Sequence, residues 1–213
     1  MERDIVFERI QRGAGILEEN MDAFTSLITP RNEKQRLLLN ALERIEKTLK
    51  SKDREEKKEG VRALLVCGSE GRGKSWIISG LINKYLYNKY AATENTDGMA
   101  MYLTHYELDL RDKSCMNPKA SKTQVEQYND FCDVPLLVID EIGRGSWSDY
   151  TAQNIENIIS RRYSNLRPTI LITNKTKAEI AKMFDRSILD RIANGKTGLV
   201  LDMDFAGSSS ERR

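Results

Sequence analysis

The chain has 213 residues, of which 39% are hydrophobic, and its 34 Lys and Arg against 32 Asp and Glu leave a formal net charge of +2. This size allows one domain with a buried core. The near balance of charge excludes a broadly basic coat, so any contact with nucleic acid would depend on a local patch or on assembly of several copies.

Compartment and membrane association can be addressed from the same composition. The longest apolar runs, such as ALLVC at 63–67, are too short to cross a bilayer, and no apolar signal stretch follows the charged start. The three cysteines are an odd number without metal-ligand spacing, which is typical of reduced thiols. We therefore expect a cytoplasmic protein.

The first sixty residues are read as helical and largely exposed. Residues 1–30 lack clean periodicity and predict a short helical appendage, with partner docking as its possible role. Residues 31–51 predict a charged helix with one apolar stripe, and 51–60 carry mixed charge too dense for a core. The stripe residues are Leu38, Leu42, Ile45 and Leu49.

From residue 61 onward, apolar runs of strand length alternate with helical periodicity. This alternation predicts an α/β layer fold with a mostly parallel sheet. Residues 106–133 are polar and are expected to contain a surface excursion around 114–122. The predicted strands are 61–67, 99–104, 135–140, 168–174 and 197–205, and the predicted helices are 73–90, 149–163 and, as one helix or two, 176–195.

A glycine-rich segment, GSEGRGKS at 68–75, lies between the first predicted strand and its helix. It fits the phosphate-binding pattern G-x-x-x-x-G-K-[ST] in the context that this motif requires; a turn with a chance Lys-Ser is the alternative. Glycines let backbone N–H groups approach phosphate, and the helix N-terminus favours the same anion. Lys74 would bind the β- and γ-phosphates of ATP, and Ser75 would bind Mg²⁺. The expected nucleotide-binding residues are Gly68, Ser69, Glu70, Gly71, Arg72, Gly73, Lys74, Ser75 and Trp76.

Two adjacent acids end the third predicted strand. Because ligands collect at the carboxyl ends of parallel strands, Asp140 and Glu141 are expected to lie at the edge that carries the glycine-rich loop. Asp140 would hold Mg²⁺, and Glu141 would orient the water that attacks the γ-phosphate. The alternative is that Asp140 caps the next element and Glu141 is merely exposed.

Further polar residues follow the later strands. Asn174 ends the fourth strand and would hydrogen-bond the attacking water or a γ-phosphate oxygen, although Asn also ends strands for turn reasons. Arg186 and Arg191 lie near a helix end, where either could reach a neighbouring nucleotide or pair with a nearby Asp. The arginines of SRRYSNLRP at 160–168 are expected at a solvated helix end, with contact to a neighbouring subunit or DNA as the alternative.

The order of these elements resembles the AAA+ ATPases of the DnaC/IstB group, and within it the helicase loaders, over about residues 31–213. The resemblance implies a three-layer P-loop fold with a five-stranded parallel sheet at 31–206, no C-terminal lid and a tail at 207–213. It implies that Asn174 is the sensor 1 residue and that Arg191 is the arginine finger. Arg186 matches the spacing of the family less well and is not assigned this role. ATP, Mg²⁺, a hexameric replicative helicase and assembly through the ATP site are implied with it.

In the helicase loaders, the loop and helix after the acid pair hold single-stranded DNA. The corresponding hydroxyl and aromatic residues are Ser148 and Tyr150, and Trp147 adds a second stacking surface. Packing of these side chains in the core is the alternative. Other functions left open are an IstB-like transposition helper on duplex DNA, a small-molecule kinase with a P-loop, and a nucleotide switch without hydrolysis.

Overall fold

The computed structural model describes residues 5–93, 98–117 and 119–204. This part of the chain contains one five-stranded sheet in the order β2-β3-β4-β1-β5, and every pairing in it is parallel. The predicted α/β fold with a five-stranded parallel sheet is therefore confirmed. The strands are β1 (Ala63–Cys67), β2 (Ala100–Thr104), β3 (Leu136–Asp140), β4 (Thr169–Ile172) and β5 (Gly198–Asp202).

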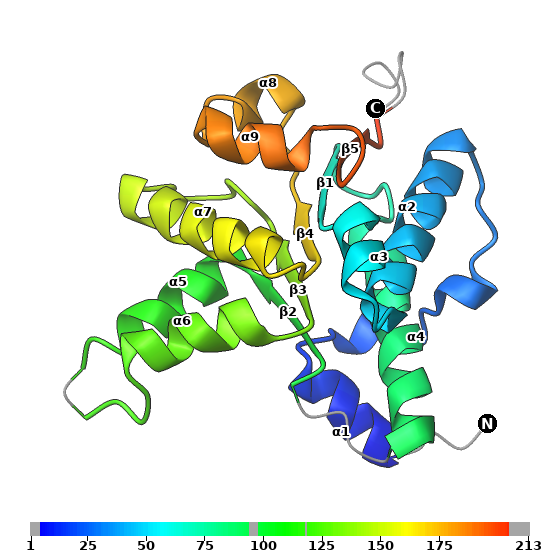
Figure 1. Ribbon diagram of the computed structural model, residues 1–213, viewed down its shortest axis with the longest axis horizontal. Helices are drawn as coiled ribbons and strands as arrows, with labels where there is room; N and C mark the ends of the chain where they lie inside the picture. Colours follow the sequence, from blue (N-terminus) through cyan, green and yellow to red (C-terminus); the bar gives the residue numbers. More distant parts are fainter. Residues whose placement is uncertain (1–4, 94–97, 118, 205–213) are drawn as a thin grey trace.

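Helices cover both faces of the sheet (Figure 1). Alternate residues of a strand point to opposite faces, and in β1 Leu64 and Val66 belong to one core cluster while Leu65 and Cys67 belong to the other. Strands buried on both faces read as continuous apolar runs, as these do. The first cluster lies under α1 (Ile5–Gly13), α2 (Glu33–Lys50) and α4 (Lys74–Thr93), and the second under α5 (His105–Ser114), α6 (Gln124–Asp133), α7 (Asp149–Ser164), α8 (Lys177–Ile180) and α9 (Arg186–Ile192).

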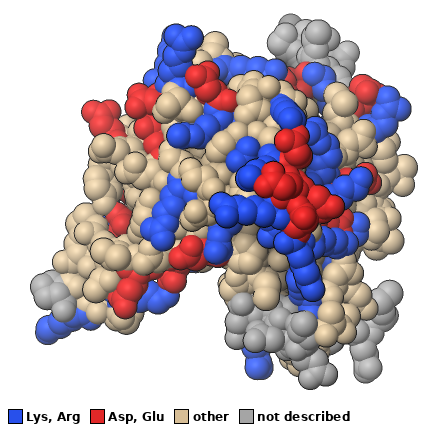
Figure 2. Space-filling model, viewed as in Figure 1, with Lys and Arg blue, Asp and Glu red and all other residues tan. Residues whose placement is uncertain are grey.

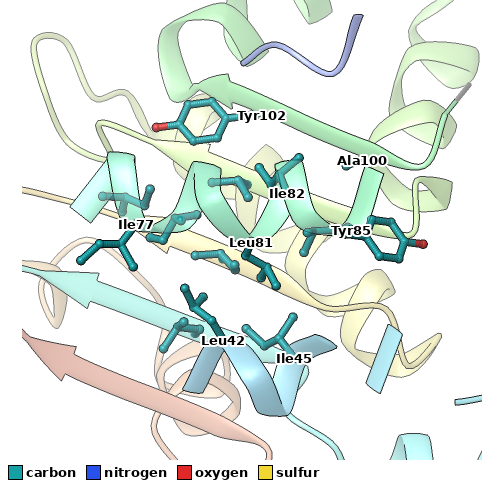
Figure 3. Close-up of a cluster of buried hydrophobic side chains, with 14 of the residues drawn as sticks. Leu42, Ile45, Ile77, Leu81, Ile82, Tyr85, Ala100 and Tyr102 are labelled. Carbon is teal, nitrogen blue, oxygen red and sulfur yellow. The ribbon is translucent and has the colours of Figure 1, made fainter. Parts of the chain in front are cut away.

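The first core cluster joins α2 and α4 to the sheet (Figure 3). Leu42 and Ile45 of α2 lie toward Leu81 of α4, whereas Ile82 of α4 lies toward β2, and all four are almost completely buried. Helix α2 begins where Asn32 accepts a hydrogen bond from a backbone N–H of its first turn. Burial of this apolar stripe fixes α4, and with it the loop at its N-terminus. The charged segment that follows α2 forms a separate exposed helix, α3 (Arg54–Glu59), capped by the Asp53 side chain.

The segment before α2 packs on the same core. It contains α1 and two short 3-10 helices, η1 (Glu18–Asn20) and η2 (Thr25–Leu27). Its buried Gln11 donates to Asn83 of α4 at 2.9 Å, and Asn83 in turn donates to the Asn20 carbonyl at 2.8 Å. Gly15, with φ 84°, passes so close to β2 that a Cβ would overlap the Tyr102 carbonyl oxygen. This segment therefore reaches the edge of the sheet near the glycine-rich loop.

Residues 105–133 form two helices where the sequence indicated only a polar stretch. Both helices begin with capping boxes, in which Thr104 pairs with Glu107 and Thr123 pairs with Glu126. Phe131 and the neighbouring thiol of Cys132 are buried under the sheet. The predicted surface excursion lies between these helices, so the polar composition concealed two helices that each bury residues against the fold.

Arg162 corrects the expectation of a solvated helix end. Its guanidinium is fully buried and donates to the Phe131, Val134 and Pro168 carbonyls at 2.7–2.8 Å, and to the Thr169 hydroxyl at 2.9 Å. Burial lowers the pKa of Arg162 to about 9. The side chain satisfies carbonyls at the amino ends of β3 and β4 and so supports the fold, whereas the other two arginines of the run are partly exposed.

Charges of both signs are interspersed on the face seen in Figure 2, where acidic side chains gather over α3 with basic ones around them. This pattern agrees with the near-zero net charge. Among the described residues, no helix has the length and apolar character needed to span a membrane.

Candidate nucleotide-binding site

The glycine-rich loop at 68–75 connects the carboxyl end of β1 to the first turn of α4. Gly68, Gly71 and Gly73 have φ values of 136°, 75° and 77°, which side chains rarely tolerate. A Cβ at Gly68 would also press against Met203, which follows β5. The loop therefore needs glycine for its path as well as for the close approach of an anion.

Lys74 lies at the centre of the site. Its ammonium donates to the Gly68 carbonyl, to the Ser69 carbonyl at 2.8 Å and to the Asn174 side-chain oxygen at 2.9 Å. Burial lowers the pKa of Lys74, against the opposing effect of nearby acids, of which Asp140 is the largest. The sequence-predicted Lys74 and Asn174, a hundred residues apart in the chain, are thus in direct contact.

The two residues predicted to bind Mg²⁺ are also in contact. The Ser75 hydroxyl donates to an Asp140 carboxylate oxygen at 2.7 Å. The hydroxyl of Tyr102, from β2, donates to the same oxygen, and burial together with the Asp140 charge raises the pKa of that phenol. Figure 3 shows the Tyr102 ring on β2 with its hydroxyl directed away from the apolar cluster. No pattern in the sequence points to Tyr102, which reaches Asp140 through pairing of β2 with β3.

Glu141 lies at the turn after β3 in a left-handed conformation, with φ 57°. Its backbone N–H donates to the Asp140 carboxylate at 2.6 Å, and its own carboxylate pairs with the guanidinium of Arg144. Asn174, which follows β4, is bound to the glycine-rich loop as well as to Lys74, because its amide donates to Glu70 at 3.3 Å. The strained backbone turns the Glu141 side chain toward the cavity that it lines.

These residues surround a cavity of about 330 Å³. The wall includes the half-exposed Trp76 of α4 and, from the N-terminal segment, Glu19 and Asn20. The sequence predicted Trp76 here but did not predict any part of residues 1–30 at the site. The remaining lining residues are Glu70, Gly71, Arg72, Gly73, Lys74, Ser75, Asp140, Glu141, Arg144 and Asn174.

Asp204, two residues beyond β5, binds the outer side of the loop. Its carboxylate accepts from the Ser69 backbone N–H at 2.9 Å, from the Ser69 hydroxyl at 3.0 Å and from Arg72 at 3.2 Å. Burial would raise the pKa of Asp204, but these hydrogen bonds from Ser69 and Arg72 outweigh it and lower the pKa. The sequence did not single out this acid, because only the pairing of β5 with β1 brings it to the loop.

Arg191 lies away from this cavity. Its guanidinium donates to the Ser160 hydroxyl of α7 at 2.8 Å, and the side chain is half-buried. Arg186 begins α9 and is exposed. Neither arginine lines the cavity of its own chain, so a role for Arg191 in catalysis would require a second copy.

The residues predicted to bind DNA lie at the start of α7. Ser148 caps this helix by accepting from the Thr151 backbone N–H at 3.1 Å. The Tyr150 hydroxyl donates to the buried carboxylate of Asp112, which raises the pKa of the phenol to about 12, and the residue as a whole is 42% exposed. Trp147 packs against other rings of the second core cluster. Trp147 is only partly buried, so its packing is observed here and stacking on DNA at this residue stays a prediction.

The donors near Asp140 suit a hard cation. Asp140 is 8% exposed and its oxygens lie beside the Ser75 hydroxyl, so oxygen ligands converge at one point. In the described part of the chain, no cluster of three or more His, Cys, Asp or Glu could hold a metal by itself. A Mg²⁺ ion here would take its other ligands from phosphate and water, as this ion commonly does.

The fold and the arrangement of the loop after β1, the acid pair after β3 and Asn174 after β4 define a P-loop domain of the AAA+ type. Solved structures with this fold include the DnaC helicase loader, with TM-score 0.63 and 22% identity over 88% of this chain and 100% of that chain. DnaI has TM-score 0.62 and 18% identity over 89% and 92% of the two chains. The replication initiator DnaA bound to AMPPCP and single-stranded DNA has TM-score 0.67 and 14% identity over 89% and 51%.

Sequence comparison gives a more specific likeness. The chain is 29% identical to the replicative helicase loader DnaC of Escherichia coli K12 over 138 residues, which are 64% of this chain and 52% of that protein. It is 24% identical to DnaC of Buchnera aphidicola subsp. Acyrthosiphon pisum over 89% of this chain and 71% of that protein. The chain thus spans about half the length of the first relative. It matches no family model. The predicted resemblance to DnaC-type AAA+ proteins is confirmed.

Proposed function

We propose that the chain is an ATP-dependent loader of a hexameric replicative helicase, acting as an oligomer on single-stranded DNA. The observation that carries this proposal is the pair of contacts Lys74–Asn174 and Ser75–Asp140 at the carboxyl ends of β1, β3 and β4. These contacts bring the groups needed for phosphate binding and hydrolysis to one cavity. The names of the curated relatives supply the loader role.

The loop is suited to hold the triphosphate. Its backbone N–H groups and the N-terminus of α4 would bind phosphate oxygens. Lys74 would exchange its bonds to the loop carbonyls and to Asn174 for bonds to the β- and γ-phosphates. Ser75 and Asp140 would hold Mg²⁺, which when bound would neutralise charge on the phosphates.

Hydrolysis would depend on Glu141 and Asn174. Both residues line the cavity, Glu141 directly after β3 and Asn174 after β4. The Glu141 carboxylate would accept a proton from water and orient it toward the γ-phosphate. The Asn174 amide would hydrogen-bond the same water or a γ-phosphate oxygen, and in an oligomer Arg191 of a neighbouring copy would stabilise the transition-state charge.

Single-stranded DNA would contact the start of α7 through the Tyr150 ring. The phenolic hydroxyl is already bound to Asp112, so the exposed ring face is the part available for stacking on a base or sugar. Ser148 would add a hydrogen bond to phosphate beside its capping role. Stacking is independent of base identity, which suits a loader that acts on many sequences.

Tyr150 allows stacking and packing to be separated by two variants. Tyr150→Ala should weaken single-strand binding by about 1–3 kcal/mol, whereas Tyr150→Phe, which keeps the ring, should bind normally. Tyr150→Phe leaves the buried Asp112 carboxylate without this donor and should lower the free energy of unfolding by about 1–3 kcal/mol. Fluorescence anisotropy with labelled oligonucleotide and chemical denaturation measure the two effects. Unchanged DNA affinity in Tyr150→Ala would leave Tyr150 with a packing role alone.

Two assays test the loader proposal as a whole. Turnover of ATP should be stimulated by single-stranded DNA, and the protein should capture the replicative helicase of its own organism in a pull-down. Phosphate transfer to a small acceptor would instead indicate a kinase. Capture of a transposase without the helicase would indicate the transposition helper, the same-family alternative.

A further inference from the structure

The turn after the acid pair contains an arginine with a glycine on either side. Gly143 and Gly145 both have φ 77°, and Arg144 lies between them. The base of this turn is fixed, because Ile142 is buried, its N–H donates to the Ile172 carbonyl at 3.0 Å and its carbonyl accepts from Thr173 at 2.7 Å. Arg144 is therefore held at a defined position beside the end of β4, while its side chain is 62% exposed and has room to turn.

Arg144 faces the nucleotide cavity. It lines that cavity together with Lys74, Asp140 and Asn174, and its guanidinium pairs with Glu141. The pairing neutralises the carboxylate that would orient water and occupies one of its oxygens. A Glu141 side chain bound in this way has one carboxylate oxygen fewer to accept a hydrogen bond from water.

The other cations of the cavity wall also have partners in this structure. Lys74 donates to the loop and to Asn174, and Arg72 binds Asp204. The cavity wall has four acids and three cations. The acids are Glu19, Glu70, Asp140 and Glu141, and the cations are Arg72, Lys74 and Arg144. A γ-phosphate entering this cavity would be a stronger partner for Arg144 than a single carboxylate, because guanidinium binds phosphate through the same forked geometry and the phosphate carries more charge.

We propose that Arg144 is a catalytic residue whose side chain leaves Glu141 and binds the γ-phosphate of ATP held in the same chain. This movement places the Arg144 guanidinium against the γ-phosphate and leaves the Glu141 carboxylate available to orient water. ADP has no phosphate at this position, so Arg144 stays on Glu141 when ADP is bound. This inference rests on the proposed ATPase function and assigns the chain a way to distinguish ATP from ADP.

The test compares the affinities of Mg·ATP and Mg·ADP in wild type and Arg144→Ala. We expect ATP affinity to fall by about 10- to 100-fold, ADP affinity to stay within about twofold and the hydrolysis rate to fall. Arg144→Lys keeps the positive charge but loses the forked hydrogen-bonding geometry of guanidinium. Its ATP affinity should lie between those of wild type and Arg144→Ala. Arg36→Ala is a matched control, since Arg36 is also 62% exposed and also pairs with a glutamate three residues earlier, but lies on α2 outside this cavity.

Three results would overturn the inference. Equal losses for ATP and ADP, or no loss for either, would mean that Arg144 does not contact the γ-phosphate. Faster hydrolysis at unchanged ATP affinity would make Arg144 a brake on Glu141. Loss of single-strand affinity with normal nucleotide binding would make it a DNA contact. If wild type binds neither nucleotide, the proposed function itself fails, which the wild-type titrations report separately.

Discussion

Lys74→Ala is expected to abolish measurable binding of Mg·ATP while the chain stays folded. Lys74 is 6% exposed and lines the cavity, and it donates to two carbonyls of the glycine-rich loop and to Asn174, which lines the same cavity. Hydrogen bonds from a charged donor contribute about 1.5–3 kcal/mol each, so loss of the ammonium from the β- and γ-phosphates should lower affinity by at least about 100-fold. Burial already lowers the pKa of Lys74, so removing the side chain also removes a desolvated charge.

Isothermal titration calorimetry measures the loss, and circular dichroism with a thermal melt checks the fold. Lys84→Ala is a suitable control, because Lys84 lies on the same helix and pairs with Glu46 at 2.8 Å away from the cavity. A Lys74→Ala protein that still bound ATP tightly would contradict the assignment of 68–75 as the phosphate loop. A protein that no longer folded would show instead that the loop needs this side chain for its own structure.

Glu141→Gln is expected to stop hydrolysis and to keep ATP binding. Glutamine preserves the shape of the side chain but cannot accept a proton, so turnover should fall by about 10²- to 10⁴-fold. ATP affinity should change little, because Lys74, Ser75 and Asp140 hold the phosphates and Mg²⁺ in the proposed site. If hydrolysis drives release, the variant should also remain bound to single-stranded DNA in the presence of ATP.

Single-turnover hydrolysis and dissociation from labelled oligonucleotide measure these two effects. Glu19→Gln removes another carboxylate that lines the same cavity and should leave turnover near the wild-type value. Normal turnover in Glu141→Gln would exclude Glu141 as the group that orients water. Unchanged DNA release with lost turnover would favour a binding switch that works by nucleotide exchange.

The central part of the fold could be predicted because its signals are local. The apolar run of β1 is followed at once by the glycines, Lys74 and Ser75, and this order predicts a strand, a loop and a helix within a few residues. Asp140 follows directly on the apolar run of β3. Parallel pairing then brings both places to one edge, and the contact between Ser75 and Asp140 is the result expected from that rule.

Contacts that depend on distant pairing could not be predicted in this way. Tyr102 reads as an ordinary strand residue, and only the register of β2 on β3 brings its hydroxyl to Asp140. Asp204 reads as an acid after a strand until β5 pairs with β1 beside the loop. The N-terminal segment reaches the cavity through buried polar contacts of Gln11 and Asn83, which have no periodic signature.

Local charge and polarity predicted solvent exposure for some side chains that tertiary contacts bury wholly or in part. Arg162 lies in a basic run that indicates solvent, yet carbonyl groups at the amino ends of two strands surround it. Trp147 lies in a polar loop that indicated an exposed ring, yet the side chain packs on Phe184 and is partly buried. Helices α5 and α6 follow capping boxes that could have been recognised, because Thr104 and Thr123 are each followed three residues later by Glu.

Calorimetric titration of the wild-type chain with ATP in the presence of Mg²⁺ tests most directly whether the cavity between the glycine loop and the acid pair binds nucleotide. We predict saturable heat with one ATP bound per chain, absent in Lys74→Ala. A flat titration of the folded wild-type protein up to millimolar ATP would contradict a nucleotide site there and, with it, ATP-dependent loading of a helicase.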